Sequence, residues 1–403
     1  MKYVIMVPDG MADYPLRELG WRTPLMVADA PVMKSLGRKG EMGTFRSLPR
    51  GAQAGSDTAN MSILGYDPVT QLTGRGALEA ASLGIELGED DIAFRCNLLT
   101  VDGDRMDDYS AGYITDPEAR KLVESIDDEL GTDTALFRAG RSFRNILVLS
   151  GGHRAAEVLT TPPHDIVGQP FAPYLPKPVG PEGKRTARVL GELMSRSKAV
   201  LENHPINAER VRNGLNPANM IWPWGPGGRL RIRPFKDIWG ISGVAIAAVD
   251  TVKGLARSAG MDAPDIPGAT GFTDTDYEAK ADYALRALRN CDLTYVHAEA
   301  TDEMGHAGDV QGKIRAIENF DSRLASRIID GLESRGEEYR LAVIPDHFTP
   351  CTVRTHVRDP TPFVIYHSDS PSESGEDYSE ESAKFGRLGI LEGDQFMKKL
   401  IQG

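Results

Sequence analysis

Two carboxylate–histidine groups stand in the C-terminal part of the chain, and each follows a short apolar run. Asp302 and His306 come after LTYVH, and the pair Asp346 and His347 comes after LAVIP. Carboxylate and imidazole are ligand types that divalent transition metals accept, and two such groups predict two ions. Either group taken alone would be interpreted as ordinary loop residues.

Two further candidate ligands border apolar runs. His356 precedes the run PFVIY, and Asp9 follows the run YVIMV at the turn PDG. In an open α/β sheet, ligands bind outside the carboxyl ends of the strands, so we expect these residues to converge at one sheet edge. A single strand-end aspartate is often only a turn former. Three aspartates at equivalent places favour a metal site.

The stretch AGSDTAN contains a candidate nucleophile. Ser56 precedes a segment with helical periodicity, Ala59 to Leu64, and stands where a helix N-cap belongs. It is either a cap alone or a nucleophile at a helix N-terminus, where backbone N–H groups favour an incoming phosphate. A serine hydroxyl bound to a divalent cation loses its proton near neutral pH without a histidine base. Spacing alone leaves both interpretations open.

Composition limits the class of protein. The chain has 403 residues, 40% of them hydrophobic and 26% charged, with a formal charge of −12. This acidic balance argues against nucleic acid or an anionic membrane as partner, whereas a small phosphorylated substrate needs only local positive charge. The three cysteines are widely spaced and favour a reducing compartment, and no apolar stretch is long enough to span a bilayer. We therefore expect a cytoplasmic enzyme.

The order of apolar runs and helical periodicity predicts an α/β fold with an insertion. Residues 1–90 and 236–403 alternate strands and helices and should form a metal-binding domain around a mostly parallel sheet with helices on both faces. Residues 91–235 begin with a hairpin that turns at Asp102-Gly103 and are predicted to form an inserted α+β domain. Three local expectations are one long helix over 313–334, a loop at WPWGPGG (222–228) and a mobile acidic surface loop over 367–386.

Several motifs together resemble a known family. VPDGMAD, AGSDTANMSILGYDP, HAEATDEMGHAGD, PDHFTP and RTHVRDPTPF are similar to motifs of the archaeal-type branch of the cofactor-independent (2,3-bisphosphoglycerate-independent) phosphoglycerate mutases. This family belongs to the alkaline phosphatase superfamily. The resemblance covers nearly the whole chain and implies an alkaline-phosphatase-like sheet. It also implies interconversion of 3-phosphoglycerate and 2-phosphoglycerate, in glycolysis and gluconeogenesis, without 2,3-bisphosphoglycerate.

The resemblance also implies which residues form the site. Ser56 would become phosphoserine. The residues that would hold the two metals are Asp302, His306 and His356 for one, and Asp9, Ser56, Asp346 and His347 for the other. The family commonly uses manganese, with magnesium, cobalt or zinc in some members. The inserted domain would close over the substrate and supply contacts to its phosphate and carboxylate.

Substrate contacts are less well specified. Lys253 resembles the lysine that reaches the phosphoryl group in the larger, bacterial-type mutases, whose arginine-rich motifs are not recognisable here. The insert offers Arg95 and Asn97 on a predicted strand, and His164-Asp165 after two prolines. Arg95 is either a ligand or an exposed arginine in an edge strand. The His164-Asp165 pair is either a positioned acid/base pair or a turn.

Two other residues of the chain are left with weaker assignments. Arg144 is a further candidate ligand in the insert. His297 is assigned a structural position together with the other remaining histidines, although it lies only five residues before Asp302.

Three rival functions remain compatible with the same residues. A homoserine-kinase-like phosphotransferase of threonine biosynthesis would use the metal–serine site with another acceptor, because GPEGKRT lacks the glycine spacing of a Walker A loop. A phosphatase or phosphonate hydrolase of the same superfamily would release free phosphate, although the large insert favours a lidded transferase. A binding protein with structural metals has no use for a serine at a helix N-terminus. We predict the mutase; the sequence leaves a monomer and a homo-oligomer both open.

Overall fold

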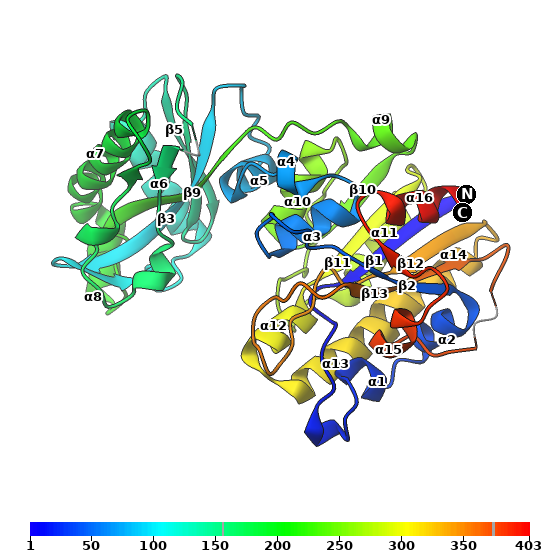
Figure 1. Cartoon of the computed structure of the whole chain (residues 1–403). Coiled ribbons are helices and arrows are strands. Elements are labelled where there is room, and N and C mark those ends of the chain that lie inside the picture. The colour runs from blue at the N-terminus through cyan, green and yellow to red at the C-terminus, as the bar shows by residue number, and fades with distance from the viewer. Residues whose placement is uncertain (155–156, 373–374) are drawn as a thin grey trace. The chain divides into compact units, whose positions relative to one another are not determined.

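The computed structural model describes residues 1–154, 157–372 and 375–403 and divides the chain into two compact units. The first unit comprises Met1–Leu72 and Ile232–Gly403, and the second comprises Thr73–Arg231 (Figure 1). The second unit begins at Thr73, before the predicted boundary at 90/91. The reason is that helix α5 (Arg75–Ser82) packs against strands β3 (Ile92–Asp102) and β9 (Met220–Gly228) of that unit. No helix of the described residues is long and apolar enough to cross a bilayer.

The first unit is built on a seven-stranded sheet. Among its described strands, only β13 runs antiparallel to its neighbours, which confirms the predicted mostly parallel sheet. In spatial order the strands are β10 (Gly243–Ile246), β11 (Leu293–Ala298), β1 (Lys2–Pro8), β12 (Tyr339–Val343), β13 (Thr361–His367), β2 (Glu41–Phe45) and β14 (Ile390–Leu391).

Helices cover both faces of this sheet, as predicted. They are α1 (Pro24–Val27), α2 (Pro31–Lys39), α3 (Ser56–Ile63), α4 (Pro68–Gln71), α9 (Phe235–Trp239), α10 (Asp250–Ser258), α11 (Tyr277–Ala287), α12 (Ala300–Ala307), α13 (Val310–Asn319), α14 (Ser326–Glu333), α15 (Glu380–Lys384) and α16 (Gln395–Gln402), with a 3-10 turn at Arg17–Leu19.

Alternate residues of each strand face opposite sides of the sheet, and both sets are buried. Val4 and Met6 belong to the core that α11 and α14 complete on one face. On the other face, Phe396 of α16 contacts Phe45 and Phe363, with ring centroids 5.6 and 5.4 Å apart. Burial on both faces explains why the strands are near-continuous apolar runs in the sequence.

The helix predicted over 313–334 is interrupted. Between α13 and α14, Phe320–Ala325 forms a π-helical segment. This segment directs the buried Asp321 to the start of α2, where its carboxylate accepts the backbone N–H groups of Met33 and Val32 at 2.7 and 3.1 Å. The α2 N-terminus has no local side-chain cap, so Asp321 supplies one from a distant part of the chain.

The second unit has an antiparallel sheet ordered β4-β3-β6-β5, with β9 paired to the other side of β3. The predicted hairpin is confirmed, since Asp102 pairs with Arg105 across its turn. The elements are β3 (Ile92–Asp102), β4 (Arg105–Asp108), β5 (Ala135–Arg141), β6 (Arg144–Leu149), β7 (Val158–Leu159), β8 (Lys177–Pro178), β9 (Met220–Gly228), α5 (Arg75–Ser82), α6 (Asp116–Leu130), α7 (Gly183–Glu202) and α8 (Pro205–Arg212), with 3-10 turns at Pro163–Ile166 and Ala172–Tyr174.

The prediction of a loop at WPWGPGG is wrong, because these residues lie in strand β9. Among the described strands β9 pairs with β3 alone and is therefore an edge strand. An edge strand tolerates Pro223 and Pro226 because not every backbone position must donate a hydrogen bond. Near its end, Gly228 accepts a hydrogen bond from the Thr73 hydroxyl, so the first and last parts of the second unit lie side by side.

The prediction of a mobile loop over 367–386 is wrong for most of its C-terminal half, while residues 373–374 lie outside the described chain. Tyr378 is fully buried and donates a hydrogen bond to the carbonyl of Pro362 at 2.9 Å. Gly37 leaves room for it, because a Cβ there would lie 2.2 Å from the Tyr378 backbone nitrogen. Helix α15 follows directly.

One buried ion pair fastens the segments that follow β1 and β12. Lys313 of α13 is fully buried and donates to Asp13 Oδ2 and to the carbonyl of Thr349, both at 2.9 Å. The same Asp13 oxygen accepts the backbone N–H of Cys351 at 3.0 Å. The two segments therefore share one polar anchor beneath the sheet edge.

Replacing Lys313 by methionine should destabilise the protein by about 3–5 kcal/mol, because it leaves the Asp13 carboxylate buried and unpaired. Urea denaturation followed by circular dichroism measures this loss. The exposed Lys398→Met variant is the control and should lose less than about 1 kcal/mol, since its partner Asp394 stays in water. Equal losses in the two variants would contradict the anchoring role.

Candidate metal centre

The predicted metal-binding residues meet at one edge of the seven-stranded sheet. Strands β1 and β11 are parallel and pair Pro8 with Ala298, so Asp9 and the start of α12 leave the sheet together. Asp346 follows the parallel strand β12 at the same edge. Because β13 is antiparallel to β12, its beginning lies at this edge, and the preceding His356 is brought there too.

The first group of side chains is centred on Asp302. His306 Nε2 lies 3.2 Å from Asp302 Oδ2, and His356 Nε2 lies 3.6 Å from Asp302 Oδ1. The two Nε2 atoms are 3.0 Å apart. His306 also places Nδ1 3.0 Å from the carbonyl of Arg354, which assigns the proton to Nδ1 and leaves the Nε2 lone pair facing the group.

The second group surrounds His347. Its Nε2 lies 3.1 Å from Ser56 Oγ and 3.5 Å from both Asp9 Oδ1 and Asp346 Oδ2. Its Nδ1 lies 4.0 Å from Asp302 Oδ1, so the imidazole stands between the two groups. The fold thus brings all seven predicted ligands into one contiguous cluster.

Ser56 does not act as a helix cap. The N-cap of α3 is Gly55, and Ser56 is the first helical residue, whose hydroxyl accepts no backbone N–H of the helix. The hydroxyl instead faces His347. The structure therefore removes the interpretation of Ser56 as a cap alone.

Two residues that the sequence analysis did not single out support this part of the site. Asn60 Nδ2 donates to the carbonyl of Ser56 at 2.7 Å and to Asp346 Oδ2 at 2.9 Å. The Tyr295 hydroxyl in turn donates to Asn60 Oδ1. Asn60 follows Ser56 by four residues, one helical turn, which is the signal that could have identified it.

The turn after β1 requires glycine. Gly10 has φ +61° and donates its N–H to Asp346 Oδ1 at 3.1 Å. A Cβ at this position would lie 2.4 Å from Asp302 Oδ1 and 2.6 Å from Thr349 Oγ1. The Thr349 hydroxyl itself donates to Asp302, so no space remains for a side chain.

The electrostatics of the cluster call for positive charge. Burial and the negative charges of Asp346 and Asp302 raise the pKa of Asp9 well above its usual range. Burial also opposes ionisation of Asp302, but hydrogen bonds with His306 and His356 outweigh it and hold the pKa of Asp302 well below its usual range. Without a cation, a protonated His306 Nε2 donates to Asp302, and this hydrogen bond raises the pKa of His306 to about 9. A bound cation would replace that proton and use the Nε2 lone pair.

The donor set fits divalent metal ions. Asp9 Oδ1 is buried and has no hydrogen-bond partner among the described residues. Two sets of nitrogen and carboxylate atoms lie close enough to hold an ion: Asp302, His347 and His356 in one set, and Asp9, His297 and Asp346 in the other. Three buried carboxylates cost several kcal/mol each unless cations neutralise them. The donor set of the cluster therefore suits divalent cations.

Arg95 lies inside the sheet of the second unit. Strand β3 runs between β6 and β9, so the alternative of an exposed edge arginine is wrong. The guanidinium lies 2.9 Å from Glu79 and 4.1 Å above the ring of Trp224. Burial lowers the pKa of Arg95, and the nearby charges of Arg144 and Arg75 act in the same direction.

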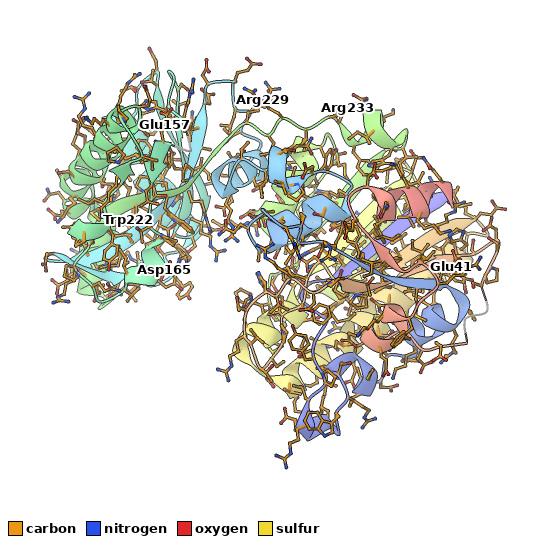
Figure 2. All side chains as sticks on the ribbon, viewed as in Figure 1. Glu41, Glu157, Asp165, Trp222, Arg229 and Arg233 are labelled. Atoms are coloured by element: carbon orange, nitrogen blue, oxygen red, sulfur yellow. The ribbon has the colours of Figure 1, made fainter. Side chains whose placement is uncertain are left out.

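The other predicted contacts of this unit surround Trp224. Asn97 accepts the indole N–H at 2.9 Å and donates to the carbonyl of Tyr109, so its amide supports the fold. The His164 ring packs edge-on against Trp224 at 5.5 Å, and the exposed Asp165 (Figure 2) lies 3.6 Å from His164 Nε2. Burial lowers the pKa of His164, and three arginines lower it further. We call the three arginines and the neighbouring imidazole the basic cluster: Arg75, Arg95, Arg144 and His164.

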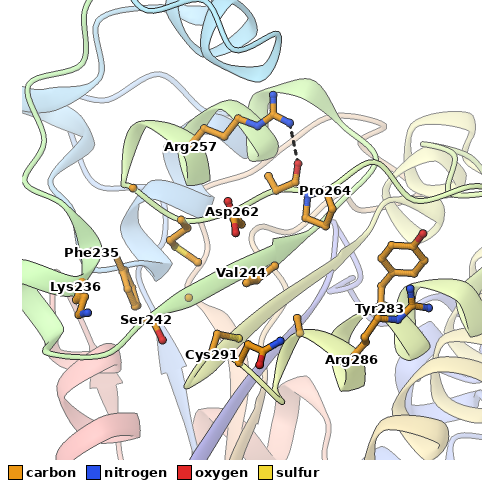
Figure 3. A pocket seen from close by; sticks show the side chains of 16 residues that line it. Phe235, Lys236, Ser242, Val244, Arg257, Asp262, Pro264, Tyr283, Arg286 and Cys291 are labelled. Carbon is orange, nitrogen blue, oxygen red and sulfur yellow. Dashed lines mark hydrogen bonds between the residues drawn. The ribbon is translucent and has the colours of Figure 1, made fainter.

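The ion pair of Lys253 and the cavity at the β10 edge include none of the predicted metal ligands. Lys253 on α10 is buried, and its amino group is paired with Asp265. A cavity of about 770 Å³ lies at the β10 edge of the sheet, where Val244 and Asp262 line it and Arg257 donates to the carbonyl of Ala263 at 2.9 Å (Figure 3). None of the predicted site residues lines this cavity.

Known proteins resemble the chain over its full length. It is 45% identical over 403 residues to the 2,3-bisphosphoglycerate-independent phosphoglycerate mutase of Methanosarcina acetivorans, covering 100% of both chains. It is 48% identical to 2,3-bisphosphoglycerate-independent phosphoglycerate mutase 2 of Methanothermobacter thermautotrophicus, covering 100% of this chain and 97% of the relative. The chain belongs to the 2,3-bisphosphoglycerate-independent phosphoglycerate mutase family. The family model of that description matches residues 37–207.

Solved structures agree with membership of the 2,3-bisphosphoglycerate-independent phosphoglycerate mutase family. The cofactor-independent phosphoglycerate mutase from Thermoplasma acidophilum is 30% identical with a TM-score of 0.70, covering 100% of this chain and 99% of its own. The PH0037 protein from Pyrococcus horikoshii is also 30% identical with a TM-score of 0.83, covering 100% and 96% of the two chains. The resemblance drawn from the motifs is confirmed.

Replacing Gly10 by alanine should weaken divalent-metal binding by at least about tenfold, because the new Cβ displaces Asp302, which is a predicted ligand. Titration calorimetry with the metal-free protein measures this effect. Gly20→Ala is the matched control, since Gly20 also has positive φ but no atom within 4 Å of the added Cβ. Both variants carry the left-handed backbone penalty of about 1–2 kcal/mol. If both bind metal equally well, crowding at Gly10 does not shape the site.

Proposed function

We propose that the chain interconverts 3-phosphoglycerate and 2-phosphoglycerate through a phosphoserine formed on Ser56. Full-length similarity to the mutases supports the activity. One observation carries the mechanism: Ser56 Oγ, at the first residue of α3, lies 3.1 Å from His347 Nε2 within the cluster of carboxylates and imidazoles. No comparison supports a homoserine kinase or a phosphatase for this chain.

The proposed ligands follow the two groups of the cluster. Asp302, His306 and His356 hold one cation, and Asp9, Asp346, His347 and Ser56 Oγ hold the other. We propose Mn²⁺ for both positions, as the family resemblance implies; the carboxylate donors suit it. When bound, the cations lower the pKa of the Ser56 hydroxyl and neutralise the phosphoryl oxygens.

The chain's own groups orient the nucleophile and receive the phosphoryl group. Asn60 holds the Ser56 carbonyl and the Asp346 carboxylate together, which keeps Ser56 in place against the second group. The positive end of the α3 dipole lies at Ser56 and favours the negative phosphoryl oxygens there.

The reaction is two successive transfers. A bond forms between Ser56 Oγ and phosphorus as the bond from phosphorus to one glycerate oxygen breaks. The glycerate turns without leaving, and its second hydroxyl oxygen bonds to phosphorus as the Ser56 bond breaks. The first oxygen gains a proton and the second loses one, so no net proton is consumed. Water must be kept out because it would hydrolyse the phosphoserine.

The substrate is a small trianion or dianion and needs cationic contacts. The basic cluster of the second unit gathers three guanidinium groups and His164, and Trp224 and Glu79 hold Arg95 rigidly. We propose that this cluster binds the carboxylate or phosphate of the substrate. Lys253 and Asp165 remain predicted contacts of the same substrate.

Replacing Ser56 by alanine should reduce mutase turnover more than about 10³-fold, because no other group can accept the phosphoryl group. An enolase-coupled assay of 3-phosphoglycerate, with Mn²⁺ and without 2,3-bisphosphoglycerate, measures this. Ser62→Ala is the control on the same helix, since Ser62 bonds only the carbonyl of Thr58 at 3.1 Å and should keep turnover within a few-fold. Retained activity in Ser56→Ala would exclude the phosphoserine, and phosphorylation of homoserine by ATP would revive the kinase.

Replacing Arg95 by lysine should raise the KM for 3-phosphoglycerate about 10–100-fold, because one charge-assisted, planar contact is worth about 1.5–3 kcal/mol. Steady-state kinetics measures the change. Arg105→Lys is the control, because the Arg105 side chain is exposed, lies outside the basic cluster and donates to the carbonyl of Gly168 at 2.7 Å. An unchanged KM in Arg95→Lys, with thermal unfolding like wild type, would remove Arg95 from substrate binding.

A further inference from the structure

His297 is buried in strand β11 and faces carboxylates with both ring nitrogens. Nδ1 lies 3.1 Å from Glu299 Oε1. Nε2 lies 3.5 Å from Asp9 Oδ2 and 3.9 Å from Asp346 Oδ2. Nε2 is fully buried and has no hydrogen-bond partner among the described residues. The sequence analysis had left this histidine as structural.

Glu299 is held as an ionised acceptor for His297. Lys280 is fully buried and donates to Glu299 Oε2 at 2.9 Å and to the carbonyl of His297 at 2.8 Å. Because a carboxylate only accepts, Glu299 requires the proton of His297 to be on Nδ1. In a neutral imidazole the Nε2 lone pair then points toward Asp9 and Asp346.

The distances on the Nε2 side suit a shared cation better than a hydrogen bond. N–H···O bonds in proteins span about 2.7–3.2 Å, and both separations here are longer. Two ligand atoms bound to one ion at about 2.1 Å, with angles of about 110–140°, lie about 3.4–3.9 Å apart. A lone pair facing two carboxylates is repulsive unless positive charge lies between them.

We infer that His297 Nε2 is a ligand of the cation that Asp9 and Asp346 hold, and that Glu299 and Lys280 fix its orientation. This is the arrangement in which a ligating histidine donates its other N–H to a carboxylate. The inference rests on the proposed cation site but not on the substrate. The competing explanation is a permanently protonated imidazolium that balances the carboxylates without binding metal.

Wild-type protein labelled with ¹⁵N at histidine and saturated with ¹¹³Cd²⁺ tests the inference without any variant. Four imidazoles should show coupling to cadmium, namely those of His297, His306, His347 and His356. Coupling at three imidazoles, with a fourth protonated on both nitrogens, would establish the imidazolium and overturn the inference. Absence of cadmium coupling at every imidazole would refute the proposed cation site itself, which separates the two failures.

Binding of Mn²⁺ to the metal-free full chain gives an independent measurement. His297→Gln should weaken one of the two Mn²⁺ affinities about 10–100-fold, followed by the loss of the free-ion paramagnetic resonance signal. The control is His367→Gln, a histidine at the end of β13 in the same sheet, which should leave both affinities within about twofold. Thermal unfolding of the metal-free proteins shows whether each variant folds. Unchanged affinities in folded His297→Gln would overturn the inference.

Discussion

The confinement of three carboxylates at one sheet edge is the constraint on which the site depends. Asp9, Asp302 and Asp346 are each nearly inaccessible to water, and the charges of Asp346 and Asp302 raise the pKa of Asp9. Such a group is stable only if hydrogen-bond donors and cations compensate it. The surrounding imidazoles and the serine hydroxyl are arranged to share those cations. The charges of the three carboxylates therefore affect both the stability of the fold and the proposed chemistry of the site.

The surrounding scaffold keeps these carboxylates from moving apart. The Gly10 backbone and Asn60 both donate to Asp346, while Thr349 donates to Asp302. Lys313 joins the segments after β1 and β12, because its amino group donates to Asp13 in one and to the carbonyl of Thr349 in the other. These contacts come from four different parts of the chain, so the geometry of the site depends on the completed sheet rather than on any local motif.

Much of this could be predicted from the sequence because parallel strands buried on both faces are apolar runs that end abruptly in polar residues. Asp9, Asp302 and Asp346 were identified in this way. His356 was identified from its place before the run PFVIY, but only the structure explains why it lies at this edge: the strand that follows it is antiparallel to β12. Asn60 and His297 were not predicted as site residues. Asn60 lies within a helix and His297 within a strand, where side chains are usually structural. Their functions appear only when distant segments meet.

Predictions made from local sequence were wrong where a contact with a distant part of the chain decides the conformation. The π-helical segment exists where Asp321 caps α2, almost 290 residues away in the chain. WPWGPGG contains two prolines that suggest a loop, but an edge position beside β3 accepts them. Tyr378 is anchored in the core although its neighbours are acidic and rich in serine. The composition of a segment reflects all its residues together, so it does not reveal one buried residue such as Tyr378 that fixes the segment in place.

The meeting of Thr73 with Gly228 has a consequence for how such a chain could have arisen. A unit whose entry and exit lie together can be spliced into a surface loop of a host without stretching either junction. The unit has its own antiparallel sheet and its own hydrophobic core, so its ancestor could have been an independent module. Shuffling of modules of this kind would let one metal-bearing host acquire new acceptors by exchanging only the inserted piece.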